Sequence, residues 1–136
     1  NANYLINKIK INRLDEFLKY YKTNNGEYHS YYTFPLKLKK PSTRLKLVKY
    51  LEKNGIETRP MMGGCLPDQP AFQKSKIKII GNLKNSRDIR DNVFFIGVHP
   101  KLKKKHFDHV INCLKKFFFK DINSLLNKKQ LLADKF

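Results

Sequence analysis

The chain of 136 residues has no tryptophan, only two cysteines, and only 11 acidic residues against 29 basic ones. Cys65 and Cys113 lie far apart without C-x-x-C spacing, so the sequence indicates neither a zinc site nor a disulfide framework, and we expect a reducing, cytoplasmic setting. No apolar run approaches the roughly 20 residues that span a bilayer. A secretory signal pattern is also lacking, and the chain begins with Asn1, so we expect the carboxyl-terminal piece of a longer protein.

The shortage of acidic residues gives a formal net charge of +18, which would ordinarily indicate binding to nucleic acid or to an anionic membrane. However, 24 of the basic residues are Lys and five are Arg, and Asn, Ile, Tyr and Phe are also abundant, as an AT-rich coding sequence favours. The lysines are spread along the chain, mostly where a helix would expose them to solvent. We therefore do not expect a nucleic-acid partner, although a stand-alone basic nucleic-acid-binding module stays as an alternative.

Helical and strand patterns alternate along the chain, which predicts an α+β fold: a two-layer small sheet with helices mainly on one face. Apolar spacing predicts four helices. The first covers 13–22 after a cap at Asn12, and the second runs from Pro41 to Asn54-Gly55 with a stripe of Leu45, Leu47, Val48 and Leu51. The third runs from Asn85 or Ser86 to Asp91, and the fourth from Phe107 to Phe118. Leu125, Leu126, Leu131 and Leu132 suggest a marginal last helix.

Three strands are predicted from alternation and from a short apolar run. They cover 31–38, where Pro35 argues for an edge position or a bulge, then 56–61, and then 93–98, which we expect to be the central strand. The alternation also places Tyr32 inward, so its ring is predicted to be a strand residue rather than a stacking platform for a base. A brief extended piece is expected at 77–80.

The stretch GIETRPMMGGCLPDQPAF, residues 55–72, combines the features of a binding loop. Gly63 and Gly64 let the backbone take a positive φ or approach a ligand closely, and the Arg59 guanidinium can bind an anion through two parallel hydrogen bonds. Gln69 opens a Gln-Pro-Ala-Phe run that predicts a single helical turn. Cys65 fits a small residue filling a tight loop, although a thiol close to a guanidinium would be reactive.

Histidines form the remaining candidate site. His99 follows a predicted strand, and binding residues gather at strand ends, although a histidine before proline is also typical of a turn. His106 and His109 share a helix at a spacing of three, which could present two imidazoles to a metal. Because no third ligand is in view, we predict no metal site.

Three segments carry a resemblance to a known family: YYTFPLKL at 31–38, the loop at 55–72, and IIGNLKNSRDIRDNVFFIGVHPKL at 79–102. They resemble the carboxyl-terminal small domain of the DegT/DnrJ/EryC1/StrS aminotransferases, pyridoxal-phosphate (PLP) enzymes of fold type I. The nearest branch is that of nucleotide-sugar 3-dehydratases, which act on 4-keto-6-deoxy sugars in lipopolysaccharide biosynthesis. The loop departs from the family pattern, since Cys65 replaces a usual Asn and Asp68 stands where a basic residue is common.

The resemblance implies an enzyme whose cofactor, PLP or pyridoxamine phosphate, is bound mainly by a large domain outside this chain, so no catalytic residue is expected here and the fragment alone is predicted to be inactive. Its implied role is substrate placement. The residues expected to contact a nucleotide-sugar are Arg59, Gly63, Gly64, Gln69 and His99.

The implied partners are the large domain of the same enzyme and a second copy in a homodimer. On this interpretation residues 1–30 are a helix and linker from the large domain, residues 31–120 are the small domain, and residues 121–136 are a Lys-rich tail. A sugar aminotransferase of the same family is the alternative function, because only the large domain separates the two activities.

Overall fold

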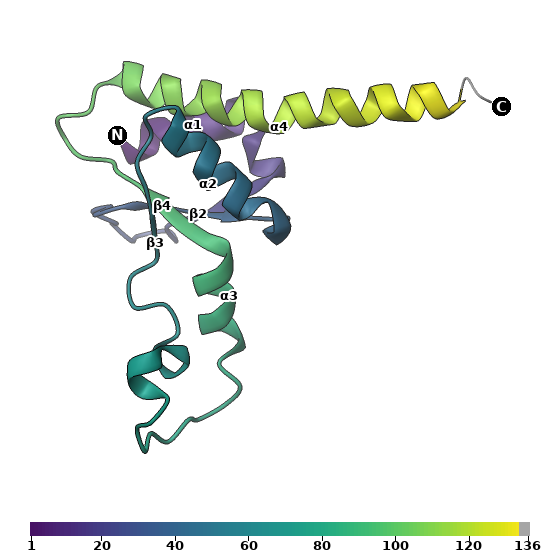
Figure 1. Ribbon diagram of the computed structural model, residues 1–136. Helices are drawn as coiled ribbons and strands as arrows, with labels where there is room; N and C mark the ends of the chain where they lie inside the picture. The colour runs from purple at the N-terminus through teal and green to yellow at the C-terminus, as the bar shows by residue number, and fades with distance from the viewer. Residues whose placement is uncertain (134–136) are drawn as a thin grey trace.

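The computed structural model describes the backbone of residues 1–133 and the side chains of residues 1–120 other than Pro41. Its helices and strands are, in chain order, α1 (Ala2–Ile11), β1 (Leu18–Tyr20), β2 (Phe34–Leu38), α2 (Arg44–Lys53), β3 (Thr58–Pro60), α3 (Lys84–Asn92), β4 (Val93–Ile96) and α4 (Lys104–Ala133). In Figure 1, α1, α2 and α4 lie on one side of the sheet, and α3 extends from the other side together with the segment that precedes it. The predicted α+β fold with helices mainly on one face is therefore confirmed.

The four strands form one antiparallel sheet in the order β1-β2-β4-β3. β4 is an interior strand, as predicted, and its Phe94 lies opposite Leu36 of β2. β2 is interior as well, so the edge position expected from Pro35 is wrong. Because β1 pairs only with residues 36–38, the side of Pro35 that faces β1 has no ladder partner, and a missing N–H is tolerated there.

The core lies between the sheet and the helices. In β2 the buried residues Phe34, Leu36 and Leu38 alternate with half-buried ones, as the period of a strand requires. The stripe predicted for the helix from Phe107 to Phe118 is confirmed in α4, and its buried members are Phe107, Val110, Ile111, Leu114 and Phe118. α4 packs against both α1 and α2, and its backbone continues as one helix through the range where a separate last helix was expected.

The helix predicted at 13–22 is wrong. The helix lies earlier, in α1, and Asn12 ends it instead of starting the next one, since its side-chain amide donates to the Lys8 carbonyl at 2.8 Å. Arg13 then takes a left-handed φ of 56°, which turns the chain towards β1. Leu14 and Leu18 are both buried, but Leu14 belongs to a short 3-10 turn and Leu18 to β1. The two leucines are four residues apart, which is also the spacing of an apolar stripe on a helix.

The helix expected after Pro41 is confirmed as α2, and its stop at Asn54-Gly55 is confirmed by the positive φ of Gly55, 75°. Leu47 and Leu51 face the core, whereas Leu45 is 61% exposed and lies outside the stripe. Tyr32 is 82% exposed, so its predicted inward orientation is wrong: β2 begins only at residue 34, and Tyr32 precedes the alternation.

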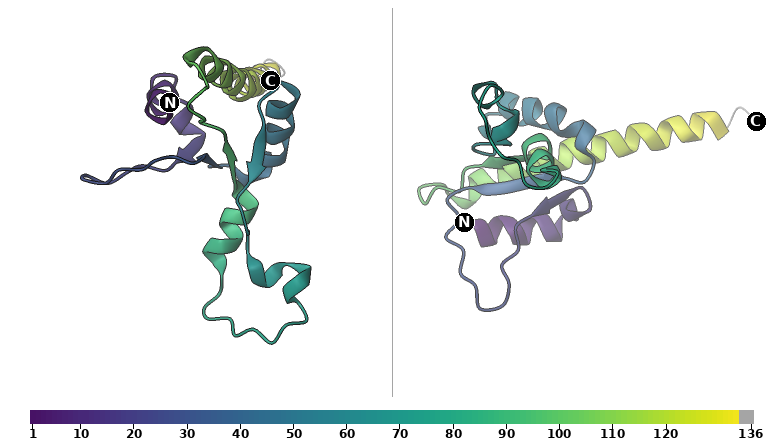
Figure 2. Two further views of the ribbon diagram at one scale, coloured as in Figure 1. Left: turned by 90° about the vertical axis from the view of Figure 1, so that its left-hand side faces the viewer. Right: turned by 90° about the horizontal axis from the view of Figure 1, so that it is seen from below.

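The segment between β3 and α3, residues 61–83, projects away from the sheet and is called the protrusion below (Figures 1 and 2). The turn predicted after Gln69 is confirmed as a 3-10 turn at Pro70–Phe72, while residues 77–80 form no strand. α3 begins at Lys84, whose N–H is bound by the Asn82 side chain, so the caps expected at Asn85 or Ser86 are wrong. Within the described part of the chain, no helix is both long and apolar enough to cross a membrane.

Candidate functional site

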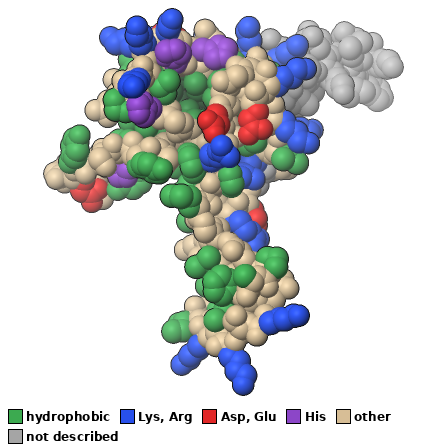
Figure 3. All heavy atoms as spheres, turned by 60° about the vertical axis from the view of Figure 1, so that its left-hand side comes forward, with side chains coloured by type: hydrophobic (Ala, Val, Ile, Leu, Met, Phe, Trp, Pro, Cys, Tyr) green, Lys and Arg blue, Asp and Glu red, His purple; other side chains and the backbone are tan. Residues whose placement is uncertain are grey.

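A cavity of about 460 Å³ opens between the β3 edge of the sheet and the first turns of α4. Arg59 reaches it from β3, His99 from the loop after β4, and His106 and His109 from α4. The structure thus brings together two of the predicted site residues, Arg59 and His99, and adds the two histidines that had been considered for metal binding. Figure 3 shows histidines and hydrophobic side chains together on this upper part of the molecule, bordered by Lys and Arg.

The guanidinium of Arg59 is held by Glu57, which sequence reasoning missed. Two residues apart on an extended chain, the side chains share one face, and Glu57 Oε1 accepts from Arg59 Nε at 2.9 Å and from Nη2 at 2.5 Å. Both side chains are largely exposed, at 67% and 74%, so solvent screens the pair and it contributes little to stability. The pair instead fixes the direction of the guanidinium, because Arg offers its donors in a rigid fork.

Each histidine at the cavity has one ring nitrogen engaged with the backbone. Nδ1 of His99 accepts from the Lys101 N–H at 3.2 Å, and Nδ1 of His106 accepts from the Lys103 N–H at 2.9 Å. His109 Nε2 donates to the Asn54 carbonyl at 2.8 Å and so joins α4 to the end of α2. Over the residues whose side chains are described, no three His, Cys, Asp or Glu side chains gather as a metal site.

The other walls of the cavity are mostly apolar and come from Ile56, Phe95, Ile96, Phe107 and Val110. A cavity with an apolar wall and an Arg59–Glu57 pair at its rim suits a ligand that has a polar group and a less polar body. Among the described residues that line the cavity there is no lysine.

Gly63, Gly64 and Gln69 lie apart from the cavity, in the protrusion. Gly63 and Gly64 have positive φ angles of 76° and 53°, as predicted for glycines in a tight loop. Gln69 Nε2 donates to the Gly63 carbonyl at 2.7 Å and closes the turn. The predicted site residues therefore form two groups, one at the cavity and one in the protrusion. Cys65 is buried and free, which fits a filling role better than a reactive one.

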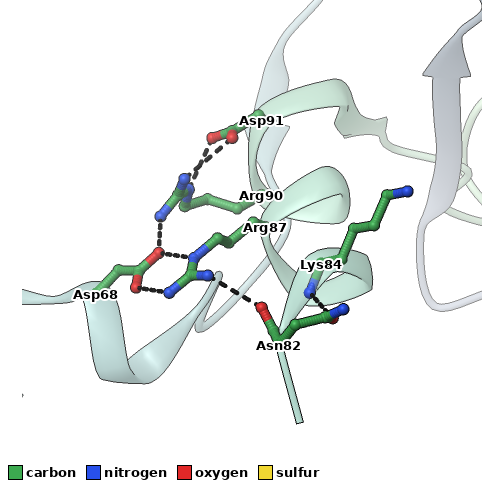
Figure 4. Close-up of polar contacts among 6 residues, drawn as sticks. All are labelled: Asp68, Asn82, Lys84, Arg87, Arg90 and Asp91. Atoms are coloured by element: carbon green, nitrogen blue, oxygen red, sulfur yellow. Dashed lines mark hydrogen bonds and ion pairs between the residues drawn. The ribbon is translucent and has the colours of Figure 1, made fainter.

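A polar cluster beside these glycines was missed by sequence reasoning. Asp68 of the protrusion lies between two guanidinium groups of α3, those of Arg87 and Arg90, and Asp91 binds Arg90 in turn (Figure 4). The Arg87 hydrogen bonds, with help from Arg90, hold the pKa of Asp68 well below its usual range. The spacing of three between the two arginines was a signal, because such residues share one face of a helix.

Comparison with known proteins identifies relatives along nearly the whole chain. The model of the DegT/DnrJ/EryC1/StrS aminotransferase family matches residues 2–115. The lipopolysaccharide biosynthesis protein RfbH of Salmonella typhimurium is 34% identical over 119 residues, which are 86% of this chain and 27% of that protein. The dTDP-4-dehydro-2,6-dideoxy-D-glucose 3-dehydratase of Saccharopolyspora spinosa is 35% identical over 78 residues, which are 57% of this chain and 17% of that enzyme.

Solved structures share the fold. A GDP-4-keto-6-deoxymannose-3-dehydratase variant with bound GDP-perosamine has a TM-score of 0.72 and 26% identity, covering 85% of this chain and 29% of that one. DesV of S. venezuelae, in complex with a ketimine intermediate, has a TM-score of 0.70 at 15% identity and supports the fold alone. The chain thus spans less than a third of the length of each of these proteins. With the family match extending over residues 2–115, this chain belongs to the DegT/DnrJ/EryC1/StrS aminotransferase family.

Proposed function

We propose that this chain is the substrate-positioning part of a PLP-dependent nucleotide-sugar enzyme, of the 4-keto-6-deoxy-sugar 3-dehydratase type, in deoxysugar or lipopolysaccharide biosynthesis. The observation that carries the proposal is the 34–35% identity to a lipopolysaccharide biosynthesis protein and to a sugar 3-dehydratase. Solved aminotransferases of this fold are 15–17% identical and support the fold alone, so transamination stays the alternative.

Within such an enzyme the cavity would receive part of the nucleotide-sugar. Arg59 carries the positive charge for an anionic group such as a diphosphate, and Glu57 keeps the guanidinium in one direction. His99 stands at the same cavity, and its apolar wall would exclude water from the bound group. Gly63, Gly64 and Gln69 would approach the substrate from the protrusion.

The catalytic groups and the cofactor belong, on this proposal, to polypeptide outside this chain, because the chain spans less than a third of the length of its relatives. PLP, when bound there, would supply the electron sink for removal of the sugar hydroxyl. The large domain and a second copy of the enzyme are the proposed partners, and the buried free cysteines fit a cytoplasmic site of action. The chain by itself should be inactive.

An NMR titration of the whole chain with GDP-mannose and with dTDP-glucose tests the proposed role. We expect amide shifts at residues 56–59 and 97–99 on addition of at least one of the two, and their loss in Arg59→Gln. Arg13→Gln is the matched control, because Arg13 also pairs with a carboxylate, that of Glu16, away from the cavity. The chain incubated with PLP and either nucleotide-sugar should give no turnover.

The opposite results are equally clear. Turnover by this chain alone would contradict the assignment of catalysis to other polypeptide. Shifts that spread over the lysines, disappear in moderate salt and are unchanged in Arg59→Gln would favour the basic nucleic-acid-binding module, whose affinity for DNA should fall steeply with salt.

A further inference from the structure

The protrusion is held in place with very little buried apolar surface. Of its residues, 61–83, all of which are described, Cys65 alone is buried. Five of its larger apolar side chains are exposed, namely Met62, Leu66, Ile77, Ile79 and Ile80, whereas Met61, Phe72 and Leu83 are half-buried. Segments with few buried contacts open easily, so polar contacts must decide where this one lies.

A single guanidinium joins both limbs of the protrusion to α3. Arg87 donates from Nε and Nη2 to the two carboxylate oxygens of Asp68, each at 2.9 Å, which fixes the outgoing limb. Its Nη1 donates to the Asn82 carbonyl at 3.0 Å, which fixes the returning limb. A parallel pair of charge-assisted bonds sets orientation as well as distance, and only the planar fork of arginine can make all three contacts (Figure 4).

Arg90 contacts the same carboxylate from one turn further along α3. Asp91 accepts from Nε and Nη2 of Arg90 at 2.7 and 3.0 Å, which directs its Nη1 towards Asp68. The approach is tight, because a Cβ added at Gly64 would lie 3.2 Å from Cγ of Arg90, and the φ of 53° at this residue also favours glycine. The glycine predicted to serve a ligand thus makes room for this arginine.

The clamp acts locally. The side chains of Asp68, Arg87 and Arg90 are 25–44% exposed, and ion pairs at such positions contribute little to global stability. They do limit the conformations of a loop that buries little apolar surface. Asp68 remains charged throughout the physiological pH range, since the arginines lower its pKa.

We infer that Asp68 is a positioning residue: clamped between Arg87 and Arg90, it fixes the turn from Gly63 to Gln69 in one geometry for the incoming nucleotide-sugar. Gln69 follows Asp68 directly and bonds back to Gly63, so release of the carboxylate would free both ends of the turn. The substrate named here rests on the proposed function. The clamp itself rests only on the contacts above.

Hydrogen–deuterium exchange on the whole chain tests the clamp without any ligand. In Asp68→Asn we expect exchange across residues 61–72 to rise by about tenfold, because charge-assisted bonds that keep the turn closed are lost. Asp68→Glu keeps the charge and should recover most of the protection. Glu16→Gln, which removes an arginine–carboxylate pair outside the protrusion, should leave residues 61–72 unchanged.

Lysine variants separate the two arginines. Arg87→Lys keeps the charge but loses the fork, so exchange should rise in both limbs, at residues 61–72 and at residues 80–84. Arg90→Lys should raise exchange in residues 61–72 only, because Arg90 has no bond to the returning limb among the described contacts. An unchanged exchange rate in both Asp68→Asn and Arg87→Lys would overturn the clamp.

A GDP-mannose and dTDP-glucose titration links the clamp to binding. We expect Asp68→Asn to weaken the shifts at residues 63–69 several-fold, and Asp68→Glu to restore them. Faster exchange in Asp68→Asn with full nucleotide-sugar binding would overturn the positioning role. Faster exchange in a protein whose wild type binds neither nucleotide-sugar would support the clamp and contradict the proposed function, so the two failures are distinguishable.

Discussion

The hydroxyl of Thr58 donates a hydrogen bond of 2.7 Å to Oε1 of Glu52 and thereby joins β3 to α2. Thr58 is the buried polar residue of the described core, and β3 has only three residues with which to hold the edge of the sheet. This bond therefore helps to place the strand from which Arg59 enters the cavity.

Replacing Thr58 by valine keeps the shape of the side chain and removes the donor. We expect Thr58→Val to lower the free energy of unfolding by about 1 kcal/mol, since the Glu52 carboxylate stays partly solvated and loses only one bond. Glu52→Gln keeps an acceptor and should have a smaller effect. Urea denaturation followed by circular dichroism measures both, and a valine variant as stable as the wild type would show that the bond contributes nothing.

Gly55 ends α2 in a left-handed conformation, at a φ of 75°. A Cβ there would meet no atom within 4 Å, so the effect of Gly55→Ala should come from the backbone alone, about 1 kcal/mol of lost stability. Gly97→Ala is the matched control, because its φ lies outside the left-handed range and its added Cβ would also meet nothing. Thermal unfolding should show a lower midpoint for the first variant and an unchanged one for the second.

The spacing of apolar residues predicted those helices and strands whose buried face follows one regular period. The stripe from Phe107 to Phe118 was found because its apolar residues recur at the period of a helix. The β4 strand was found because its short run has no polar residue, as is typical of an interior strand. The first 20 residues were mispredicted because Leu14 and Leu18 are buried at a helical spacing on two different elements. The break between α1 and the 3-10 turn includes the left-handed φ of Arg13, a residue type that does not indicate a turn.

Some residues of the candidate site were also predicted from local sequence patterns, and others were missed. Arg59 was found because it precedes a glycine-rich loop and His99 because it follows a predicted strand, and they do line one cavity. Their surroundings could not be found, since His109 meets the Asn54 carbonyl across 55 residues of sequence and Asp68 meets Arg87 across 19. Contacts of that kind follow from the packing of elements, which no local pattern contains.

Two leucines of α2 give a direct test of which face meets the core. Leu47 is fully buried and Leu45 is mostly exposed, although both belong to the stripe predicted from the sequence. We expect Leu47→Ala to lower the free energy of unfolding by about 2–5 kcal/mol, because it leaves a cavity among packed side chains. Leu45→Ala should change it by no more than about 0.5 kcal/mol. Equal losses in chemical denaturation would contradict the orientation of the helix.

Acid should destabilise the protein through its paired carboxylates. The hydrogen bond from Tyr4 to Asp108, 2.7 Å long, joins α1 to α4 and, with nearby Lys8, lowers the pKa of Asp108. Lys37, and then Asn92, lower the pKa of Asp88. A carboxyl whose pKa is lower in the folded than in the unfolded state stabilises the fold above the unfolded value, and this contribution disappears as the pH falls through the ordinary carboxyl range, about 4, towards the folded value.

Urea denaturation at pH 7 and at pH 3 measures this loss. The midpoint should fall on acidification in the wild type and should fall less in Asp108→Asn, because that variant has already lost one of the titrating groups while its side chain stays about the same size. Asp15→Asn removes the same charge from an exposed turn and should leave the difference between the two pH values close to that of the wild type. If Asp108→Asn were as sensitive to acid as the wild type, the contact between α1 and α4 would not depend on the charged carboxylate. The destabilisation would then come from other paired carboxylates, such as Asp88, and from the general repulsion of a chain whose net charge is already +18 at pH 7.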